Sequence, residues 1–194
     1  MAEQEIGRVS HMARQTLAFY HDTSAPAPVD LPLLMREVVE LYGAKLRLKR
    51  IEVTENFVAS KSVVGLRGEL KQLLANLIAN ALDAMAAGGR LVLSVADSGQ
   101  GVLVTIADTG EGIDEENLPR LFEPFFTTKK DIGTGLGLWV SKGIAEKHGG
   151  KITVESSTDR HNHGTTFRVY LNGSSPKAAV TTAGKVDDKT EIPF

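Results

Sequence analysis

Residues 66–87 carry apolar side chains that recur at spacings of three and four. At about 100° per residue, this spacing predicts an amphipathic helix. The apolar side of that helix consists of Leu70, Leu73, Leu74, Leu77, Ile78, Ala81, Leu82 and Met85. Its polar side consists of Glu69, Gln72, Asn76, Asn80 and Asp83. The two glycines at 88–89 are expected to end the helix.

Shorter patterns predict the remaining elements of a single domain over residues 30–172. Asp30 is placed to cap a helix that has Pro32 in its first turn and continues toward Arg50. The other predicted elements are a strand over 51–57, a hairpin of 90–96 and 101–107 joined by 97–100, a helix over 134–148, and strands over 151–156 and 165–171.

Both ends of the chain are predicted to lie outside this domain. Residues 1–22 predict a helix with an apolar stripe suited to packing on another helix, formed by Ile6, Val9, Ala13 and Leu17. Two prolines within residues 23–29 disfavour helix, so this segment is expected to be a linker. Residues 173–194 lack apolar periodicity and are expected to form a disordered tail.

Composition narrows the possible functions. A chain of 194 residues with 42% hydrophobic content can bury one full core. Its net charge of -2 provides no basic field for nucleic acid or anionic membranes. The chain has no cysteine, no apolar run near the roughly 20 residues that cross a bilayer, and no signal-peptide pattern at its N-terminus. A cytoplasmic protein that does not bind nucleic acid is expected.

Two glycine-rich segments and an asparagine pair predict a nucleotide pocket. The segments are Asp108-Thr-Gly-Glu-Gly112 and Gly133-Thr-Gly-Leu-Gly137, and Asn76 and Asn80 precede both on the polar side of the predicted helix. The polar side of a helix taken alone is usually just solvated. Asparagine is a middling helix former, however, so two of them inside a helix suggest side chains used for binding. The amide oxygen of Asn80 suits Mg²⁺.

The segments around this pair have separate predicted roles. Asp108 ends a strand, and the glycines after it allow close approach of a flat ligand, such as adenine, whose exocyclic amine the carboxylate can bind. The second segment precedes a helix, where free N–H groups can face phosphate; its spacing is neither that of a Walker A loop nor of a Rossmann fingerprint. The long irregular stretch between them is expected to be a lid, in which Lys129 or Lys130 contacts phosphate.

These motifs resemble the conserved boxes of the histidine kinase catalytic domain. Asn76-Leu-Ile-Ala-Asn80 is similar to its N box and Asp108-Thr-Gly-Glu-Gly112 to its G1 box. Leu121-Phe-Glu-Pro-Phe-Phe126 is similar to the F box and Gly133-Thr-Gly-Leu-Gly-Leu138 to the G2 box. The resemblance implies an α+β Bergerat fold, a two-layer sandwich in which helices cover one face of a mixed sheet of about five strands. Residues 1–22 resemble the second helix of the dimerisation hairpin.

The resemblance also implies the ligands. ATP would be bound with Mg²⁺, with Asn80 as the metal ligand, Asp108 at the adenine and Thr165 nearby. The candidate nucleotide-binding residues are Asn76, Asn80, Asp83, Asp108, Gly110, Gly112, Ile113, Phe125, Lys129, Gly133, Thr134, Gly135, Leu136, Gly137, Leu138 and Thr165. No side chain is assigned to catalysis.

Asn76 indicates the type of chemistry. ATP-hydrolysing relatives of the gyrase, Hsp90 and MutL types carry a glutamate four residues before the metal asparagine, whereas this chain has Asn76 there. An amide cannot act as a general base, so the pocket favours transfer of phosphate to another acceptor over hydrolysis.

The histidine that would accept the phosphate is not evident in the sequence. Neither His11 nor His21 is followed by the residues expected after a phosphoacceptor histidine. The acceptor is therefore expected on a dimerisation hairpin outside this chain, in a homodimeric full-length kinase that passes phosphate to a response regulator receiver domain. Two alternatives of the same fold are a nucleotide-binding regulatory adaptor and a serine kinase of the anti-sigma-factor type.

Overall fold

A computed structural model describes residues 25–129 and 133–173. Its centre is a mixed five-stranded sheet in the order β2-β4-β5-β7-β6. The strands are β2 (Glu52–Phe57), β4 (Arg90–Ser98), β5 (Gly101–Asp108), β6 (Lys151–Ser157) and β7 (Gly164–Asn172). Only β2 and β4 pair in parallel, and the other neighbours are antiparallel. The predicted two-layer α+β fold is confirmed; the predicted helix in 1–22 lies outside the described residues.

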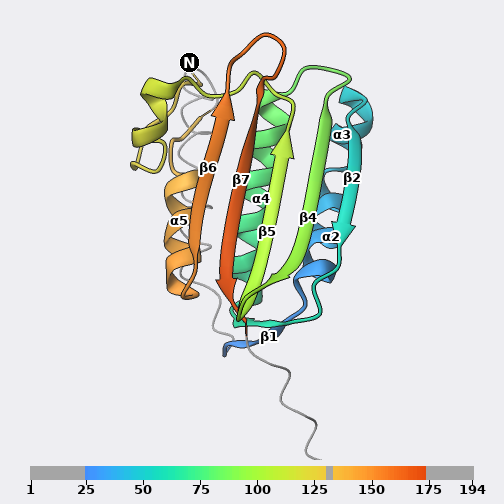
Figure 1. Ribbon diagram of the computed structural model, residues 1–194, viewed down its shortest axis with the longest axis vertical. Coiled ribbons are helices and arrows are strands. Elements are labelled where there is room, and N and C mark those ends of the chain that lie inside the picture. The colour runs from blue at the N-terminus through green and yellow to red at the C-terminus, as the bar shows by residue number, and fades with distance from the viewer. Residues whose placement is uncertain (1–24, 130–132, 174–194) are drawn as a thin grey trace, which may run out of the picture.

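Helices cover one face of this sheet (Figure 1). They are α2 (Leu31–Leu41), α3 (Gly43–Lys49), α4 (Arg67–Ala84) and α5 (Gly137–Lys147). A 3-10 helix, η1 (Glu115–Arg120), lies between the two glycine segments. Helix α4 also provides the crossover that the parallel pair β2 and β4 requires.

Helix α4 supplies the centre of the core. Its predicted apolar side is buried throughout, and Leu77, Ile78 and Leu82 are fully inaccessible. The helix ends at Ala84, earlier than predicted, because Met85 adopts an extended backbone and its side chain enters the core. The Lys49 ammonium of α3 then donates to the free carbonyls of Leu82, at 2.6 Å, and Met85, at 2.8 Å.

The predicted helix after Asp30 is two helices. Asp30 caps α2 as expected, because its Oδ1 accepts the Leu33 N–H at 2.9 Å. The chain leaves helical geometry at Tyr42, with φ -96° and ψ 3°, and α3 starts at Gly43. The Tyr42 hydroxyl donates to the Ala75 carbonyl at 3.1 Å and so fixes this corner against α4.

The predicted linker is in part a strand, which corrects the expectation for residues 23–29. Residues Ala27–Val29 form β1, which pairs antiparallel with β3 (Val63–Gly65), an element that the sequence did not predict. Proline is tolerated in a strand with a free edge, and among the described residues β1 pairs only with β3. Val29 is 4% exposed, so burial of its side chain favours the strand.

The predicted tail begins at Gly173, and residues 174–194 lie outside the described part of the chain. Within that described part, no helix is both long and apolar enough to cross a membrane.

The burial of α4 predicts a large effect of truncating its central leucine. Leu77→Ala should lower the free energy of unfolding by about 2 to 5 kcal/mol, because it removes buried methyl groups and leaves a cavity. Leu48→Ala is the matched control, since Leu48 is 84% exposed, and should change it by less than about 0.5 kcal/mol. Urea denaturation measures both; equal effects would contradict this assignment of the core.

Candidate nucleotide-binding site

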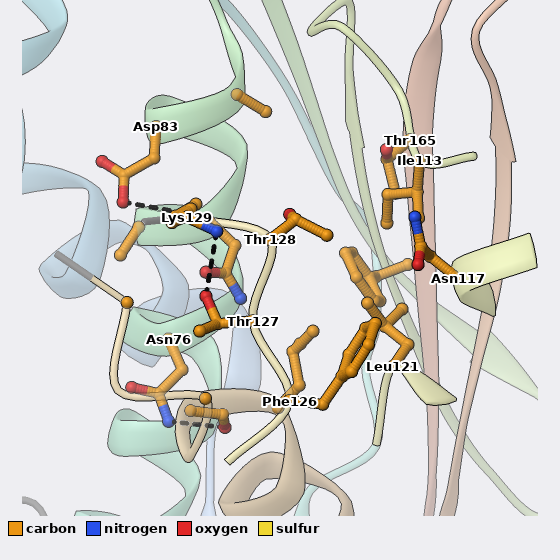
Figure 2. A pocket seen from close by; sticks show the side chains of 18 of the residues that line it. Asn76, Asp83, Ile113, Asn117, Leu121, Phe126, Thr127, Thr128, Lys129 and Thr165 are labelled. Atoms are coloured by element: carbon orange, nitrogen blue, oxygen red, sulfur yellow. Dashed lines mark hydrogen bonds and ion pairs between the residues drawn. The ribbon is translucent and has the colours of Figure 1, made fainter. Parts of the chain in front are cut away.

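A cavity of about 270 Å³ lies between α4, the end of β5, the η1 segment and the start of α5. Figure 2 shows side chains around it from α4, from η1 and the segment that follows it, and from β7. Of the predicted residues, most line it: Asn76, Asn80, Asp83, Asp108, Gly112, Ile113, Lys129, Gly133, Thr134, Gly135, Gly137, Leu138 and Thr165. The fold therefore brings Asn76, Asn80 and Asp83 of α4 and both glycine segments to one place.

Asp108 lines the cavity at the C-terminus of β5. Its backbone pairs with Leu91 on one side and Thr165 on the other, and the residue is only 7% exposed. One carboxylate oxygen accepts the Gly110 N–H at 2.8 Å. Burial raises the pKa of Asp108, against the opposing effect of backbone hydrogen bonds from Gly110 and Thr165. An acceptor held in a partly dry environment suits recognition of a ligand N–H group.

The first glycine segment rests on the ends of β6 and β7. Gly112 has φ +80°, and a Cβ atom there would lie 2.0 Å from the Ser157 carbonyl oxygen. The next amide, of Ile113, donates to Ser156 Oγ at 2.8 Å. The Ser156 hydroxyl is also 2.8 Å from Thr165 Oγ1, so the loop and Thr165 are fixed by one network.

The second glycine segment leads into α5. Gly135 has φ +67°, and a Cβ atom there would lie 2.3 Å from the Phe125 carbonyl carbon. Helix α5 starts at Gly137, three residues later than predicted, without a side-chain cap. Its first amides therefore keep free donor capacity beside the cavity, as phosphate binding at a helix N-terminus requires.

Asn76 ties this helix start to α4. Its Nδ2 donates to the Gly137 carbonyl at 3.1 Å and lies 3.4 Å from Ser141 Oγ. The fully buried Ser141 hydroxyl donates to the same carbonyl at 2.8 Å. The Asn76 amide is thus a structural donor within the site, a role that its sequence position did not reveal.

Three predicted residues do not line the cavity. Phe125 is 70% exposed with φ +66°, and its neighbour Phe126 faces the cavity instead. Leu136 is buried at the base of α5, and Gly110 packs against Ala84 and supports Asp108. In the F box, a stretch without regular secondary structure, sequence alone could not decide which phenylalanine turns inward.

The prediction also missed several lining residues. These are Ala79, Ala84, Glu111, Asn117, Leu121, Phe126, Thr127, Thr128 and Phe167. Helical spacing from Asn76 and Asn80 could have identified Ala79 and Ala84, and alternation from Thr165 could have identified Phe167. No sequence pattern could have identified Asn117, because it reaches the cavity only through the tertiary position of η1.

The donor set fits a metal ion that a nucleotide brings with it. In the described ranges, no group of three or more His, Cys, Asp or Glu side chains could hold a metal alone. Asn80 presents an amide from the α4 wall of the cavity. Mg²⁺ takes few protein ligands and completes its octahedron with phosphate oxygens and water, so one amide oxygen is compatible with it.

The sequence of residues 65–174 matches the histidine kinase-, DNA gyrase B- and HSP90-like ATPase family. The chain belongs to this family, and this region is an ATP-binding domain of its kind.

Named relatives of the chain are histidine kinases. It is 36% identical to sporulation kinase E of Bacillus subtilis (strain 168) over 71% of this chain and 18% of that protein. It is 33% identical to the sensor histidine kinase ZraS of Escherichia coli (strain K12) over 87% of this chain and 36% of that protein. The chain thus spans about a fifth to a third of the length of these relatives.

Solved structures agree with the sequence matches. The catalytic domain of histidine kinase ThkA superimposes with a TM-score of 0.69 at 34% identity, covering 77% of this chain and 96% of that domain. Histidine kinase ThkA in complex with the response regulator protein TrrA superimposes with a TM-score of 0.70 at 29% identity, covering 88% of this chain and 48% of that one.

The hydrogen bonds of Asn76 predict that an acid cannot replace it. Asn76→Asp removes the donor and places a carboxylate against the Gly137 carbonyl, so it should lower the free energy of unfolding by about 1 to 3 kcal/mol. Amide hydrogen exchange over residues 137–141 should accelerate. Asn117→Asp makes the same change on η1 and should leave that exchange unaltered; equal exchange in both variants would refute the structural role of Asn76.

Proposed function

We propose that this chain is the ATP-binding catalytic part of a sensor histidine kinase. It would transfer the γ-phosphate of ATP to a histidine on a dimerisation hairpin. The observation that carries this proposal is the role of Asn76. Where hydrolysing relatives carry a glutamate base, this chain has an amide that already donates to Gly137. No carboxylate stands at that position to activate water, so ATP would be kept for a protein acceptor.

The residues that line the cavity suggest the orientation of the nucleotide. Adenine would lie beside Asp108, where a buried carboxylate and Thr165 provide polar contacts within a partly apolar wall. The phosphates would extend toward the start of α5 and toward Lys129, whose ammonium group is paired with Asp83 in this structure. Asn80 would hold Mg²⁺, which neutralises charge on the phosphate oxygens during transfer.

In the proposed reaction, an imidazole nitrogen of the acceptor forms a bond to the γ-phosphorus. The bond from that phosphorus to the β,γ-bridging oxygen breaks, and ADP leaves. The role of this chain is to bind and orient the nucleotide so that the acceptor approaches in line.

The proposed partners follow from the same reaction. The hairpin belongs to a homodimeric kinase, and the phosphohistidine passes its phosphate to the receiver domain of a response regulator. The complex of ThkA with its response regulator supports that partner class. Because ATP is the donor, the cytoplasm is the proposed location.

Base recognition by Asp108 predicts a preference for adenine. Mg-ATP at about 100 times its dissociation constant should stabilise the 194-residue chain by roughly 2.7 kcal/mol in thermal or urea unfolding. Inosine triphosphate lacks the exocyclic amine and should bind about tenfold or more weakly. Asp108→Asn should remove this difference between the two nucleotides, whereas Asn80→Asp should weaken both alike; a preference that survives Asp108→Asn would refute the assignment.

The kinase proposal predicts labelling of a separate protein. With γ-labelled ATP and Mg²⁺, the chain should label a histidine hairpin supplied in trans with an acid-labile phosphate, and should label itself little. A hairpin whose histidine is replaced by glutamine is the control. Acid-stable labelling would support the serine kinase, release of phosphate without labelled protein would support hydrolysis, and nucleotide binding without either would support an adaptor. Any of these three results would overturn the proposal.

A further inference from the structure

Asp83 on α4 is paired with two lysines from different parts of the chain. Its Oδ1 is 2.5 Å from Lys45 Nζ on α3, and its Oδ2 is 3.0 Å from Lys129 Nζ in the segment after η1. All three side chains are partly exposed, at 38–40%. The cluster therefore has one carboxylate and two ammonium groups, one more positive charge than negative.

Asp83 and Lys129 both line the cavity, whereas Lys45 does not. Figure 2 shows Asp83 on the α4 wall joined to Lys129 by a dashed line. Asp83 lies three residues after Asn80, on the same side of the helix, and so beside the proposed metal ligand. Lys45 precedes residues 65–174, the region that the family match covers.

Helix α3 is fixed in the position that keeps Lys45 close to Asp83. Lys49, one turn further along α3, donates to the carbonyls of Leu82 and Met85, which flank Asp83 at the end of α4. Tyr42, just before α3, donates to Ala75. Three contacts with α4 thus surround Lys45, so its pairing with Asp83 is supported by the packing of the whole helix.

The carboxylate of Asp83 is held in its charged form. Burial opposes ionisation, but hydrogen bonds from Lys45 and Lys129 outweigh it and lower the pKa of Asp83 below its ordinary value. A phosphate chain entering the cavity would therefore meet a negative charge and a lysine already paired with it. Lys129 can serve the phosphates only to the extent that it gives up Asp83.

We propose that Asp83 and Lys45 set the affinity of this pocket for the phosphate chain of its ligand. Asp83 competes with phosphate oxygens for Lys129. Lys45 keeps the Asp83 carboxylate neutralised when Lys129 turns to the phosphates, which lowers the repulsion that the bound nucleotide would otherwise meet. This inference rests on the proposed binding of ATP in the cavity and adds a positioning residue from α3.

The test is a double-mutant cycle with two ligands. Lys45→Met should weaken ATP binding by about three- to fivefold, the range expected for a partly exposed pair, and should leave adenosine binding unchanged. Asp83→Asn should strengthen ATP binding by a similar factor. In the double variant the effect of Lys45→Met should disappear, because the charge that Lys45 neutralises is gone. Titration calorimetry in low salt measures each affinity, and the effects should shrink at high ionic strength.

Lys61→Met is the matched control, since Lys61 donates to Gly99 at the far end of the sheet and should change neither affinity. Equal weakening of ATP and adenosine by Lys45→Met would overturn the inference and leave Lys45 as a support of the fold. Weaker ATP binding in the Asp83→Asn variant would overturn the proposal that Asp83 competes with phosphate oxygens for Lys129. If the unaltered chain binds ATP but none of these variants differs from it, the inference alone fails. If the unaltered chain binds no ATP, the proposed function fails with it.

Discussion

The burial of one side of α4 is the constraint on which the site depends. A continuous row of leucine and isoleucine side chains fixes the rotation of this helix about its axis, because turning it would expose several of them to water. The rotation that satisfies the core also directs Asn76, Asn80 and Asp83 toward the cavity. Stability and binding therefore share one helix, and the positions of the polar groups are determined by the apolar ones.

The other walls of the cavity are backbone loops that approach each other closely. At Gly112 and Gly135 any side chain would collide with neighbouring backbone, so these turns can pack only as glycine. The resulting cavity is lined by groups of different chemistry. They are a buried acid whose raised pKa reflects desolvation, the helix start of α5 and a lysine-carboxylate cluster. Such a lining fits a ligand that carries both a base and charged groups.

Asn76 links this architecture to the proposed reaction. In a hydrolase of this family, the corresponding position needs an acid that can accept a proton. Here the same position donates a hydrogen bond that holds the start of α5, next to a buried serine with the same partner. An asparagine in place of the glutamate therefore has two effects at once: it removes the proton acceptor and supplies a hydrogen-bond donor. In the proposed function, the amide that cannot activate water also positions the amides proposed to face phosphate.

Local patterns in the sequence sufficed to predict α4, the β4–β5 hairpin, the two glycine segments and the position of Asp108 at the end of a strand. The hydrophobic period, the turn residues and the motif spacing that determine these features all act over a few residues. Contacts between distant segments decided the rest. Residues 27–29 become a strand only because β3 offers an edge. Phe126 rather than Phe125 lines the cavity, where the Phe125 N–H donates to the Gly135 carbonyl at 3.0 Å. Lys45 reaches Asp83, 38 residues away, because α3 packs on α4, and no local pattern contains such a pairing.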